Sequence, residues 1–476
     1  MMRISNFIGG EFVAPKSGAY FPDINPATAQ PIADVPDSDA ADVDAAVAAA
    51  KNAFPVWSRT TAEERSRILL RLADLIEQNL DDLARIESRD NGKPLSLARA
   101  LDIPRAVANF RFFATAILHH ASAAHITDTT ALNYTLRQPL GVAGLISPWN
   151  LPLYLLSWKI APAIASGNTC VAKPSELTPL TADRLAQLSL EAGVPAGVMN
   201  IVHGYGAKAG AALVEHRDVP MISFTGGTVT GARVAASAAP MFKKLSLELG
   251  GKNPTVVFAD ADLNDAIRTS LRSAFWNQGE ICLCGSRVFV ERSIYDQFVD
   301  AFTEGAKKLK IGDPSDESTQ VGALISEAHL HKVLGYIELA KEEGGTIVAG
   351  GSRVDRDGYF VEPTVITGLG CDRRVLQEEI FGPVVTITPF DHEEEAVAFA
   401  NSTRYGLSAS LWTRDLKRAH RVAAAIDSGT VWINCWLLRD LRVPFGGAKD
   451  SGVGREGGFE SLEFFTEAKN VCVKLG

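Results

Sequence analysis

The apolar run Leu140-Gly141-Val142-Ala143-Gly144-Leu145-Ile146 stops abruptly at the polar turn Ser147-Pro148-Trp149-Asn150. Three further short apolar runs also end at polar or Gly-rich turns, and they are Cys170–Ala172, Val198–Val202 and Met221–Phe224. Each run predicts a buried strand, and the later three turns lead into helical segments. Strands that alternate with helices are typical of a parallel sheet covered on both faces, so we expect an α/β fold. Ligands bind such sheets at the carboxyl ends of the strands, where these turns lie.

A second α/β unit is expected to begin near Lys252. Val256–Phe258 predicts a strand in it, and Leu263–Ser273 predicts a helix. Its further expected strands are Phe360–Val365, Val384–Pro389 and Val431–Asn434. A chain of 476 residues with 46% hydrophobic content is too long for one core, so two or three domains are expected.

Helices are expected near the start of the chain and a strand at its end. Ser38–Phe54 is Ala-rich, with Ser38 as the expected N-cap. Thr61-Ala62-Glu63-Glu64 has the capping-box pattern, and Gly92 ends the helical region that follows it. Val471–Lys474 alternates like an exposed strand, and we expect it to pair with another subunit.

Composition excludes several classes of partner. The net charge is -9, and Lys and Arg form no basic stripe, so no nucleic-acid partner is expected. The N-terminal segment turns polar within its first residues, and no run approaches ~18 apolar residues, so neither a signal peptide nor a membrane span is expected. Six scattered cysteines indicate reduced thiols and a cytoplasmic location. Cys282 and Cys284 are too close for a CxxC pair, and no metal site is expected.

Cys282 is the candidate nucleophile. It ends the run Phe275-Trp276-Asn277-Gln278-Gly279-Glu280-Ile281-Cys282, just before the β-rich stretch Arg287–Val290. A free cysteine is only a few per cent thiolate at neutral pH, so it needs a base or a positive environment. A lone cysteine is more often a small buried hydrophobe, which is the interpretation of Cys284. The polar, Gly-containing turn before Cys282 favours the nucleophile instead.

Glu248 is the candidate general base. Its carboxylate stands between two leucines, so it is either the solvent-facing residue of a strand or a poised base, and Gly250-Gly251 leaves room for a ligand. A nucleophilic cysteine with a carboxylate base is suited to covalent catalysis on a carbonyl. Asn150 is by default a turn former. Its amide can also donate to a developing oxyanion, with the backbone N–H of Cys282 as the second donor.

Two turns are candidates for cofactor binding. Lys173 and Glu176 are either a solvated lysine and a first-turn glutamate, or a pair that hydrogen-bonds the ribose of an adenosine. A carboxylate at that place would repel a 2′-phosphate, which favours NAD over NADP. Gly226 and Gly227 open a helix whose N-terminus can bind the pyrophosphate, although this glycine pattern alone is weak.

Arg105 and Arg439 are the candidates for substrate recognition. An arginine is by default a surface residue, but Arg439 follows the aromatic and apolar run Asn434–Leu438 and precedes Pro444–Gly447. The planar guanidinium is suited to bidentate binding of a carboxylate, so a substrate with a carboxylate is expected. Arg442 is a nearby alternative.

These motifs together resemble the aldehyde dehydrogenase superfamily over nearly the whole chain. In order, they are Pro148-Trp149-Asn150, Lys173-Pro174-Ser175-Glu176, Phe224-Thr225-Gly226, Glu248-Leu249-Gly250-Gly251, the Cys282 segment, Glu378-Glu379-Ile380-Phe381-Gly382-Pro383 and Pro444-Phe445-Gly446-Gly447. The resemblance implies a Rossmann-like NAD-binding domain, a second α/β catalytic domain and a small β oligomerisation element. The corresponding boundaries are 1–118 with 139–250, then 251–450, and 119–138 with 451–476. It also implies a homodimer or homotetramer.

The resemblance also implies a mechanism. Cys282 attacks the aldehyde to give a thiohemiacetal, hydride passes to NAD, and Glu248 activates the water that hydrolyses the resulting thioester. Lys159 matches a lysine near the proton-relay path. The cofactor-binding residues that the resemblance adds are Trp149, Glu379 and Phe381. One departure is Gly227, where the family usually has Ser, so a hydroxyl contact to the pyrophosphate is lost while backbone donors remain.

A narrower resemblance is to the 2-aminomuconic and 2-hydroxymuconic semialdehyde dehydrogenases. It is carried by Asp102–Arg105 with Asn109–Phe113, by Asn277–Cys284 and by Asn434–Arg439. Those enzymes oxidise an unsaturated six-carbon semialdehyde that bears a carboxylate, in tryptophan or aromatic catabolism. The resemblance implies such a substrate here, with Arg105 and Arg439 on its carboxylate.

Three alternatives remain open from the sequence. A CoA-acylating semialdehyde dehydrogenase needs no base for water, so Glu248 argues against it. Another aldehyde, such as betaine aldehyde or succinic semialdehyde, would use the same chemistry, although a cationic substrate would not need two arginines. A non-catalytic binding protein of the same fold would not need Cys282, Glu248 and Asn150 together.

Overall fold

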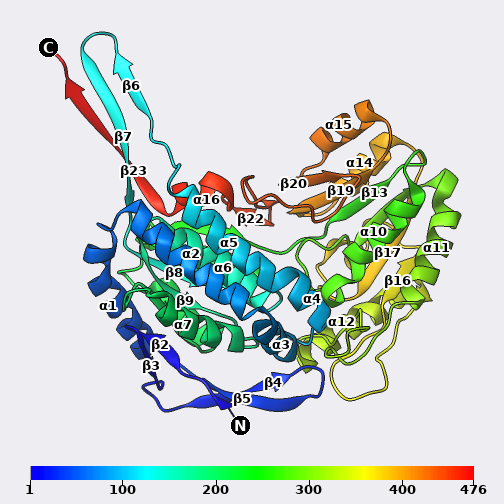
Figure 1. Cartoon of the computed structure of the whole chain (residues 1–476). Coiled ribbons are helices and arrows are strands. Elements are labelled where there is room, and N and C mark those ends of the chain that lie inside the picture. Colours follow the sequence, from blue (N-terminus) through cyan, green and yellow to red (C-terminus); the bar gives the residue numbers. More distant parts are fainter. Residues whose placement is uncertain (1) are drawn as a thin grey trace.

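The computed structural model describes residues 2–476, which form two α/β units and a projecting arm (Figure 1). The first unit is built mainly from the N-terminal half of the chain, blue to green in Figure 1. The second unit follows it, green to orange, and lies beside it.

The first unit contains an eight-stranded sheet with the order β22-β12-β11-β8-β9-β10-β2-β3. Its strands are β2 Asn6–Ile8, β3 Glu11–Val13, β8 Val142–Ile146, β9 Thr169–Lys173, β10 Met199–Ile201, β11 Met221–Thr225, β12 Lys244–Glu248 and β22 Gly452–Val453. The five central strands pair in parallel, and the outer strands β2, β3 and β22 pair antiparallel. The four strands expected from the apolar runs are all present, so the predicted parallel α/β fold is confirmed.

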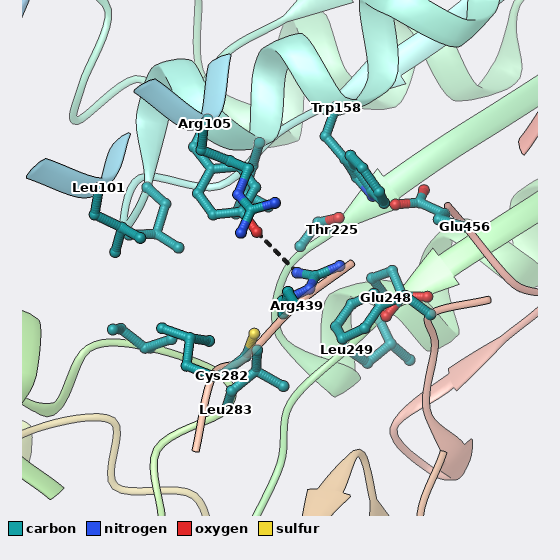
Figure 2. Close-up of a pocket in the computed structure, with 16 residues that line it drawn as sticks. Leu101, Arg105, Trp158, Thr225, Glu248, Leu249, Cys282, Leu283, Arg439 and Glu456 are labelled. Carbon is teal, nitrogen blue, oxygen red and sulfur yellow. Dashed lines mark hydrogen bonds between the residues drawn. The ribbon is translucent and has the colours of Figure 1, made fainter. Parts of the chain in front are cut away.

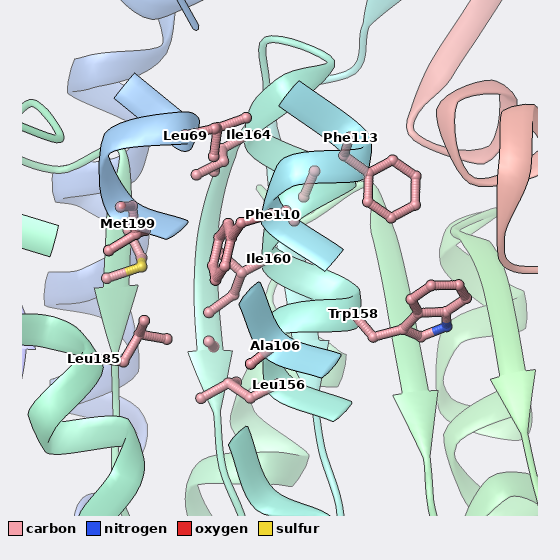
Figure 3. Close-up of a cluster of buried hydrophobic side chains, with 14 of the residues drawn as sticks. Leu69, Ala106, Phe110, Phe113, Leu156, Trp158, Ile160, Ile164, Leu185 and Met199 are labelled. Carbon is pink, nitrogen blue, oxygen red and sulfur yellow. The ribbon is translucent and has the colours of Figure 1, made fainter. Parts of the chain in front are cut away.

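Helices cover both faces of this sheet. They are α1 Ala40–Trp57, α2 Ala62–Gln78, α3 Leu80–Asn91, α4 Leu95–Leu97, a π-helical turn at Ala98–Asp102, α5 Ile103–Ala116, α6 Pro152–Ala165, α7 Leu180–Ala192, α8 Ala211–Glu215 and α9 Thr228–Ala238. Successive side chains of β8 alternate between the faces: Leu145 packs in the core with α2, α5 and α6, and Ile146 in the core with α1, α8 and α9. Phe110 of α5 and Ile160 of α6 are fully buried in the first of these cores (Figure 3). This packing fixes α6, whose first turn reaches the site described below.

The second unit contains a seven-stranded sheet with the order β15-β16-β17-β14-β13-β19-β20. Its strands are β13 Pro254–Val257, β14 Arg287–Glu291, β15 Thr346–Ala349, β16 Thr364–Thr367, β17 Val384–Phe390, β19 Ser408–Trp412 and β20 Thr430–Ile433. Its helices are α10 Leu263–Phe275, α11 Tyr295–Lys307, α12 Glu327–Glu342, α13 Arg374–Gln377, α14 Glu393–Asn401 and α15 Leu416–Ala425. All neighbouring strands are parallel except β15 with β16.

The arm is a three-stranded antiparallel sheet that projects from the first unit and carries the C-terminus (Figure 1). Its strands are β6 Ala124–Thr127, β7 Ala131–Pro139 and β23 Thr466–Lys474, and β7 lies in the middle. The expected terminal strand therefore exists and pairs with β7 of its own chain. The other edge of β23 has no partner strand within residues 2–476. The segment that precedes β23 contains β22 and α16 Gly458–Phe464, and β22 pairs with β12 of the first unit.

Short pairings complete the fold. β1 Met2–Arg3, β4 Tyr20–Asn25 and β5 Gln30–Pro36 form a separate sheet, and β18 Tyr405–Gly406 pairs with β21 Ala448–Lys449. None of these strands was expected from the sequence.

The structure corrects two local predictions. The N-cap of α1 is Asp39, not Ser38: the Asp39 side chain accepts from Ala41 N, whereas the buried Ser38 hydroxyl is hydrogen-bonded to Asn6. The strand expected from Phe360 begins only at Thr364, because the buried Phe360 lies in a loop that ends in a proline.

Two other helix-end predictions are confirmed. Thr61 caps α2 by accepting from Glu64 N, although Glu64 does not complete the capping box with a bond back to Thr61 N, and Gly92 ends α3 with φ of 86°. None of the helices within residues 2–476 has both the length and the apolar character that a membrane span requires.

Candidate active site

The turns that follow β8, β11 and β12 meet the segment after α10 where the two units face each other. Two adjoining cavities lie there, and Cys282 lines both. One of them contains the predicted substrate-recognition residues, and the other contains most of the predicted cofactor residues.

The first cavity, here called the substrate cavity, brings together Arg105, Glu248, Cys282 and Arg439 (Figure 2). The remaining side chains that line it are Leu101, Leu151, Tyr154, Leu155, Trp158, Thr225, Leu249, Ile281, Leu283, Leu437, Phe445 and Glu456. Most of this wall is apolar or aromatic, so the charged groups are few and face a weakly solvated space. Such a space strengthens the interaction of any charge with its partner.

The Cys282 loop is held in a strained turn. Asn277 and Gln278 have φ of 51° and 56°, in the left-handed region that non-glycine residues seldom adopt. The side-chain amide of Asn253 donates to the carbonyls of Cys282 and Cys284, at 2.7 and 2.9 Å. Cys282 is half-buried at the cavity, whereas Cys284 is buried behind it, as the sequence interpretation of the two residues required.

The Cys282 thiol is protonated in this environment. Its pKa is raised to about 12, mainly by burial and also by the nearby carboxylates of Glu379 and Glu248, while Arg439 acts in the opposite direction. Because the thiolate is the nucleophile, attack on a carbonyl needs a group that accepts the thiol proton.

Glu248 ends β12 and is 5% exposed, so it is not a solvent-facing strand residue. Neither of its carboxyl oxygens has a hydrogen-bond partner within residues 2–476. Burial raises its pKa well above the usual range, the negative charge of Glu456 adds to the rise, and Lys159 opposes it. An unpartnered buried carboxyl with a raised pKa is suited to accept a proton near neutral pH.

We expect Glu456→Gln to move the acid limb of the kcat–pH profile to lower pH. The substitution removes a negative charge that disfavours the ionised form of Glu248, and so lowers its pKa. Lys159, which loses its ion-pair partner, then favours ionised Glu248 more strongly. For the aldehyde oxidation that the resemblance implies, the profile is measured as NADH formation and as single-turnover thioester hydrolysis. An acid limb that stays in place or moves to higher pH would show that Glu456 does not act on Glu248.

Asn150 and the Cys282 backbone form a pair of donors. The Asn150 side-chain amide donates to the Glu280 carbonyl at 2.9 Å. That amide has a second N–H, which remains free to bind a ligand. The backbone N–H of Cys282 donates to no protein acceptor in the described part of the chain. This arrangement provides two donors beside the thiol, as an oxyanion site requires.

A fully buried lysine holds Asn150 in place. Lys93 Nζ donates to the Asn150 carbonyl at 3.0 Å and to Glu87 at 3.2 Å, and it is also bonded to Asp102. All three charged side chains are inaccessible to solvent. Asp102 ends the π-helical turn that leads to Arg105, so one buried lysine ties the Asn150 turn to the segment that carries the substrate arginine. Removing one partner of such a buried group typically costs about 3–5 kcal/mol.

The second cavity, here called the cofactor cavity, has a volume of about 260 Å³. Its lining includes the predicted residues Trp149, Asn150, Gly226, Gly227, Glu379 and Phe381, together with Pro148, Leu155, Thr225, Leu249, Gly250, Cys282, His329 and Lys332. Glu379 accepts from the Gly251 N–H at 2.9 Å. A Cβ on Gly250 would lie 2.3 Å from the Glu379 carboxylate, so any larger residue would displace that carboxylate.

Aromatic rings enclose one side of the cofactor cavity. Trp149 meets His329 and Phe381 edge-to-face, with ring centroids 5.4 and 5.3 Å away, and His329 Nε2 lies 2.6 Å from the Phe381 carbonyl. The cavity thus offers a flat ring beside Cys282, the Glu379 carboxylate and an open glycine turn at Gly227. These groups fit a nicotinamide ribose and the start of a pyrophosphate. His329 and Lys332 were not predicted, because histidines and lysines on a helix read as surface residues.

Three predicted residues lie outside both cavities. Lys173 and Glu176 form an ion pair at 2.9 Å, and neither lines the cofactor cavity. Lys159 is buried behind the substrate cavity, where its Nζ donates to Ser223 Oγ at 2.8 Å and to Glu456 Oε1 at 3.0 Å.

Sequence reasoning missed one face of α6 and the distant Glu456. Leu151, Tyr154, Leu155 and Trp158 line the substrate cavity at the three- and four-residue spacing of one helical face. This spacing was visible after Asn150 and is the signal that could have found them. Glu456 lies 208 residues after Glu248 in the chain, counted from 248 to 456, and no local pattern marks it.

Comparison with known proteins agrees with this site. Residues 12–471 match the model of the aldehyde dehydrogenase family. The chain is 55% identical over 480 residues to 2-aminomuconic semialdehyde dehydrogenase of Danio rerio, covering 99% of this chain and 98% of that protein. It is 51% identical to 2-hydroxymuconic semialdehyde dehydrogenase of Pseudomonas sp. (strain CF600), with both chains covered completely. The NAD+ complex of aldehyde dehydrogenase from Bacillus cereus has a TM-score of 0.98 at 44% identity, covering 100% of this chain and 97% of that one.

The chain therefore belongs to the aldehyde dehydrogenase family, and it is an oxidoreductase that acts on an aldehyde group. The family and the fold expected from the motifs are confirmed.

Proposed function

We propose that this protein oxidises a carboxylate-bearing semialdehyde, 2-aminomuconic or 2-hydroxymuconic 6-semialdehyde, to the dicarboxylic acid with NAD as the oxidant. The observation that carries the substrate class is a pair of arginines in the cavity of the nucleophile. Arg105 and Arg439 both line the substrate cavity, and neither has a carboxylate within ion-pair distance in the described part of the chain. Two uncompensated guanidinium groups in an apolar cavity favour an anionic ligand.

The names of the relatives support the same substrate class. Those with about half of their residues identical are named as 2-aminomuconic and 2-hydroxymuconic semialdehyde dehydrogenases. Both substrates present an aldehyde at one end and a carboxylate at the other. The aldehyde end corresponds to Cys282, and the carboxylate end corresponds to the arginine pair.

The side chains of the site divide the chemistry between them. Cys282 loses its proton to Glu248, and its sulfur bonds to the aldehyde carbon, which gives a thiohemiacetal. The Asn150 amide and the Cys282 N–H hold the oxygen of this adduct. The cofactor cavity would hold NAD, which would supply the acceptor for the hydride of the adduct carbon and so leave a thioester on Cys282. After Glu248 has released the thiol proton to solvent, it accepts a proton from the water that attacks the thioester, which releases the acid and the Cys282 thiolate.

The proposed cofactor contacts follow the cofactor cavity. Trp149, Glu379 and Phe381 contact the nicotinamide end, and Gly226 and Gly227 leave the backbone open to the pyrophosphate. Lys173 and Glu176 remain the proposed contacts of the adenosine ribose, at the carboxyl end of β9. The Glu176 carboxylate supports NAD over NADP.

An Arg105→Ala/Arg439→Ala double variant tests the substrate class. We expect kcat/KM for 2-hydroxymuconic semialdehyde to fall by two orders of magnitude or more, because each charge-assisted hydrogen bond contributes about 1.5–3 kcal/mol. Benzaldehyde, which lacks the carboxylate, should be oxidised about as well as by the wild type. Both rates are followed as NADH formation.

Arg442→Ala is the matched control. Arg442 is exposed, and its Nε donates to Asp440 at 2.9 Å, so it is not part of the cavity. It should leave both rates unchanged. A wild type that does not prefer the muconic substrate, or a double variant that loses both aldehydes equally, would contradict the proposed substrate.

The assembly and the domain roles are also proposals. Residues 1–118 with 139–250 bind NAD, 251–450 carry catalysis, and 119–138 with 451–476 join subunits into a homodimer or homotetramer. The open edge of β23 and the exposed apolar side chains of Ile126 and Val473 support a subunit contact at the arm. A monomer in sedimentation analysis would contradict it. A cytoplasmic location stays a prediction.

A further inference from the structure

We propose that Tyr154 determines specificity for the substrate carboxylate. It does so by orienting both arginines and by donating a hydrogen bond from its hydroxyl group to that carboxylate. This inference rests on the proposed function. It adds a neutral hydrogen-bond donor to a recognition site that otherwise consists of two cations.

Helix α6 places Tyr154 in the wall of the substrate cavity, next to both arginines. Asn150, beside Cys282, lies two residues before the helix, and Tyr154 lies in the first turn of the helix on the face that lines the cavity. Tyr154 is 5% exposed, so its ring is fixed by packing. Its backbone carbonyl accepts from the buried Asn109 side chain at 3.1 Å, which anchors this turn to α5.

The Tyr154 hydroxyl already has one defined partner. Arg439 Nη1 donates to the hydroxyl oxygen at 2.8 Å, the bond drawn as a dashed line in Figure 2. The hydroxyl proton has no acceptor within residues 2–476. A phenol both donates and accepts, and a cation that donates to its oxygen makes the O–H a stronger donor. The free proton therefore suits an anionic acceptor in the cavity.

The ring of Tyr154 contacts the other arginine. The Arg105 guanidinium carbon lies 5.7 Å from the centre of the Tyr154 ring, within the range of a cation–π contact. Arg439 in turn stacks over the Phe445 ring at 3.9 Å and lies 5.4 Å from the Trp158 ring. Aromatic rings and one hydroxyl thus hold both guanidinium groups in place of carboxylates, which leaves their charges available to the substrate.

Tyr154→Phe tests this role, because it removes the hydroxyl and keeps the ring under Arg105. KM for 2-hydroxymuconic semialdehyde should rise about tenfold or more, the loss of one hydrogen bond to a charged group. KM and kcat for benzaldehyde should change little. Tyr295→Phe is the matched control, since that hydroxyl bonds a backbone carbonyl in the core of the other unit.

A double-mutant cycle of Tyr154→Phe with Arg439→Met tests whether Tyr154 acts by orienting Arg439. If it does, the factor by which kcat/KM for the muconic substrate falls in the double variant should be smaller than the product of the two single-variant factors. Tyr154→Leu, which also removes the ring, should weaken the muconic substrate further than Tyr154→Phe does.

The outcomes distinguish this inference from the proposed function. A wild type without preference for the muconic substrate overturns both. A preference that persists in Tyr154→Phe, or equal losses on the muconic and neutral aldehydes, overturns the role of Tyr154 and leaves the proposed function standing.

Discussion

Cys282→Ala should abolish aldehyde oxidation while NAD still binds. Without the sulfur no thiohemiacetal forms, and loss of a nucleophile reduces turnover by a factor on the order of 10⁴ or more. The other side chains of the cofactor cavity are unchanged, so NAD should still quench the fluorescence of Trp149, which lines it. The measurements are NADH absorbance in the steady state and fluorescence titration with NAD.

Two cysteines near the site provide the controls. Cys284 is buried, and Cys435 packs in the same cluster as Cys282. Cys284→Ala and Cys435→Ala should retain turnover, since neither sulfur lines the substrate cavity. If Cys282→Ala kept substantial turnover, the nucleophile would have to be sought elsewhere.

Glu248→Gln should stop the reaction after the first hydride transfer. The amide has the size of the carboxyl but accepts no proton, and loss of a general base slows its step by about 10²–10⁴. A thioester on Cys282 should then accumulate, visible as an increase in protein mass by the acyl group. The proton of the Cys282 thiol must also be removed, so the first turnover should slow as well, because burial keeps the pKa of that thiol near 12.

Comparing NADH formation with thioester accumulation identifies the main role of Glu248. Slow NADH formation without an accumulated acyl-enzyme would show that Glu248 acts only in deprotonating the Cys282 thiol. Glu467→Gln, on the exposed arm, is the control for a change of charge elsewhere and should behave as the wild type does.

The parallel strands were predictable because their apolar runs are almost wholly buried and end at polar or glycine-containing turns. β8 and β9 are buried at every position, which is the pattern that a strand covered on both faces must have. The site residues were predictable for a related reason. Asn150, Glu248 and Cys282 stand at such turns or near glycines whose missing Cβ makes room for another group, as at Gly250.

Other parts of the fold carried no local signal. β2 has only three residues, and its place in the sheet depends on contacts with distant segments, such as the bond between Asn6 and Ser38. Lys93 reads as a surface lysine in the sequence, yet it is fully buried because Glu87 and Asp102 neutralise it. Pairings of this kind depend on tertiary structure, which periodicity does not report.

The start of helix α6 determines the length of substrate that the cavity accepts. Asn150, beside Cys282, lies two residues before the helix starts, and Tyr154 meets Arg439 from the first turn of the helix. Most of α6 is buried in the core of the first unit, so the position of this turn is fixed. The span between the reacting carbon and the anion is thus set by the start of a packed helix. A semialdehyde that is a few carbons shorter could not reach Cys282 and the arginine pair at the same time.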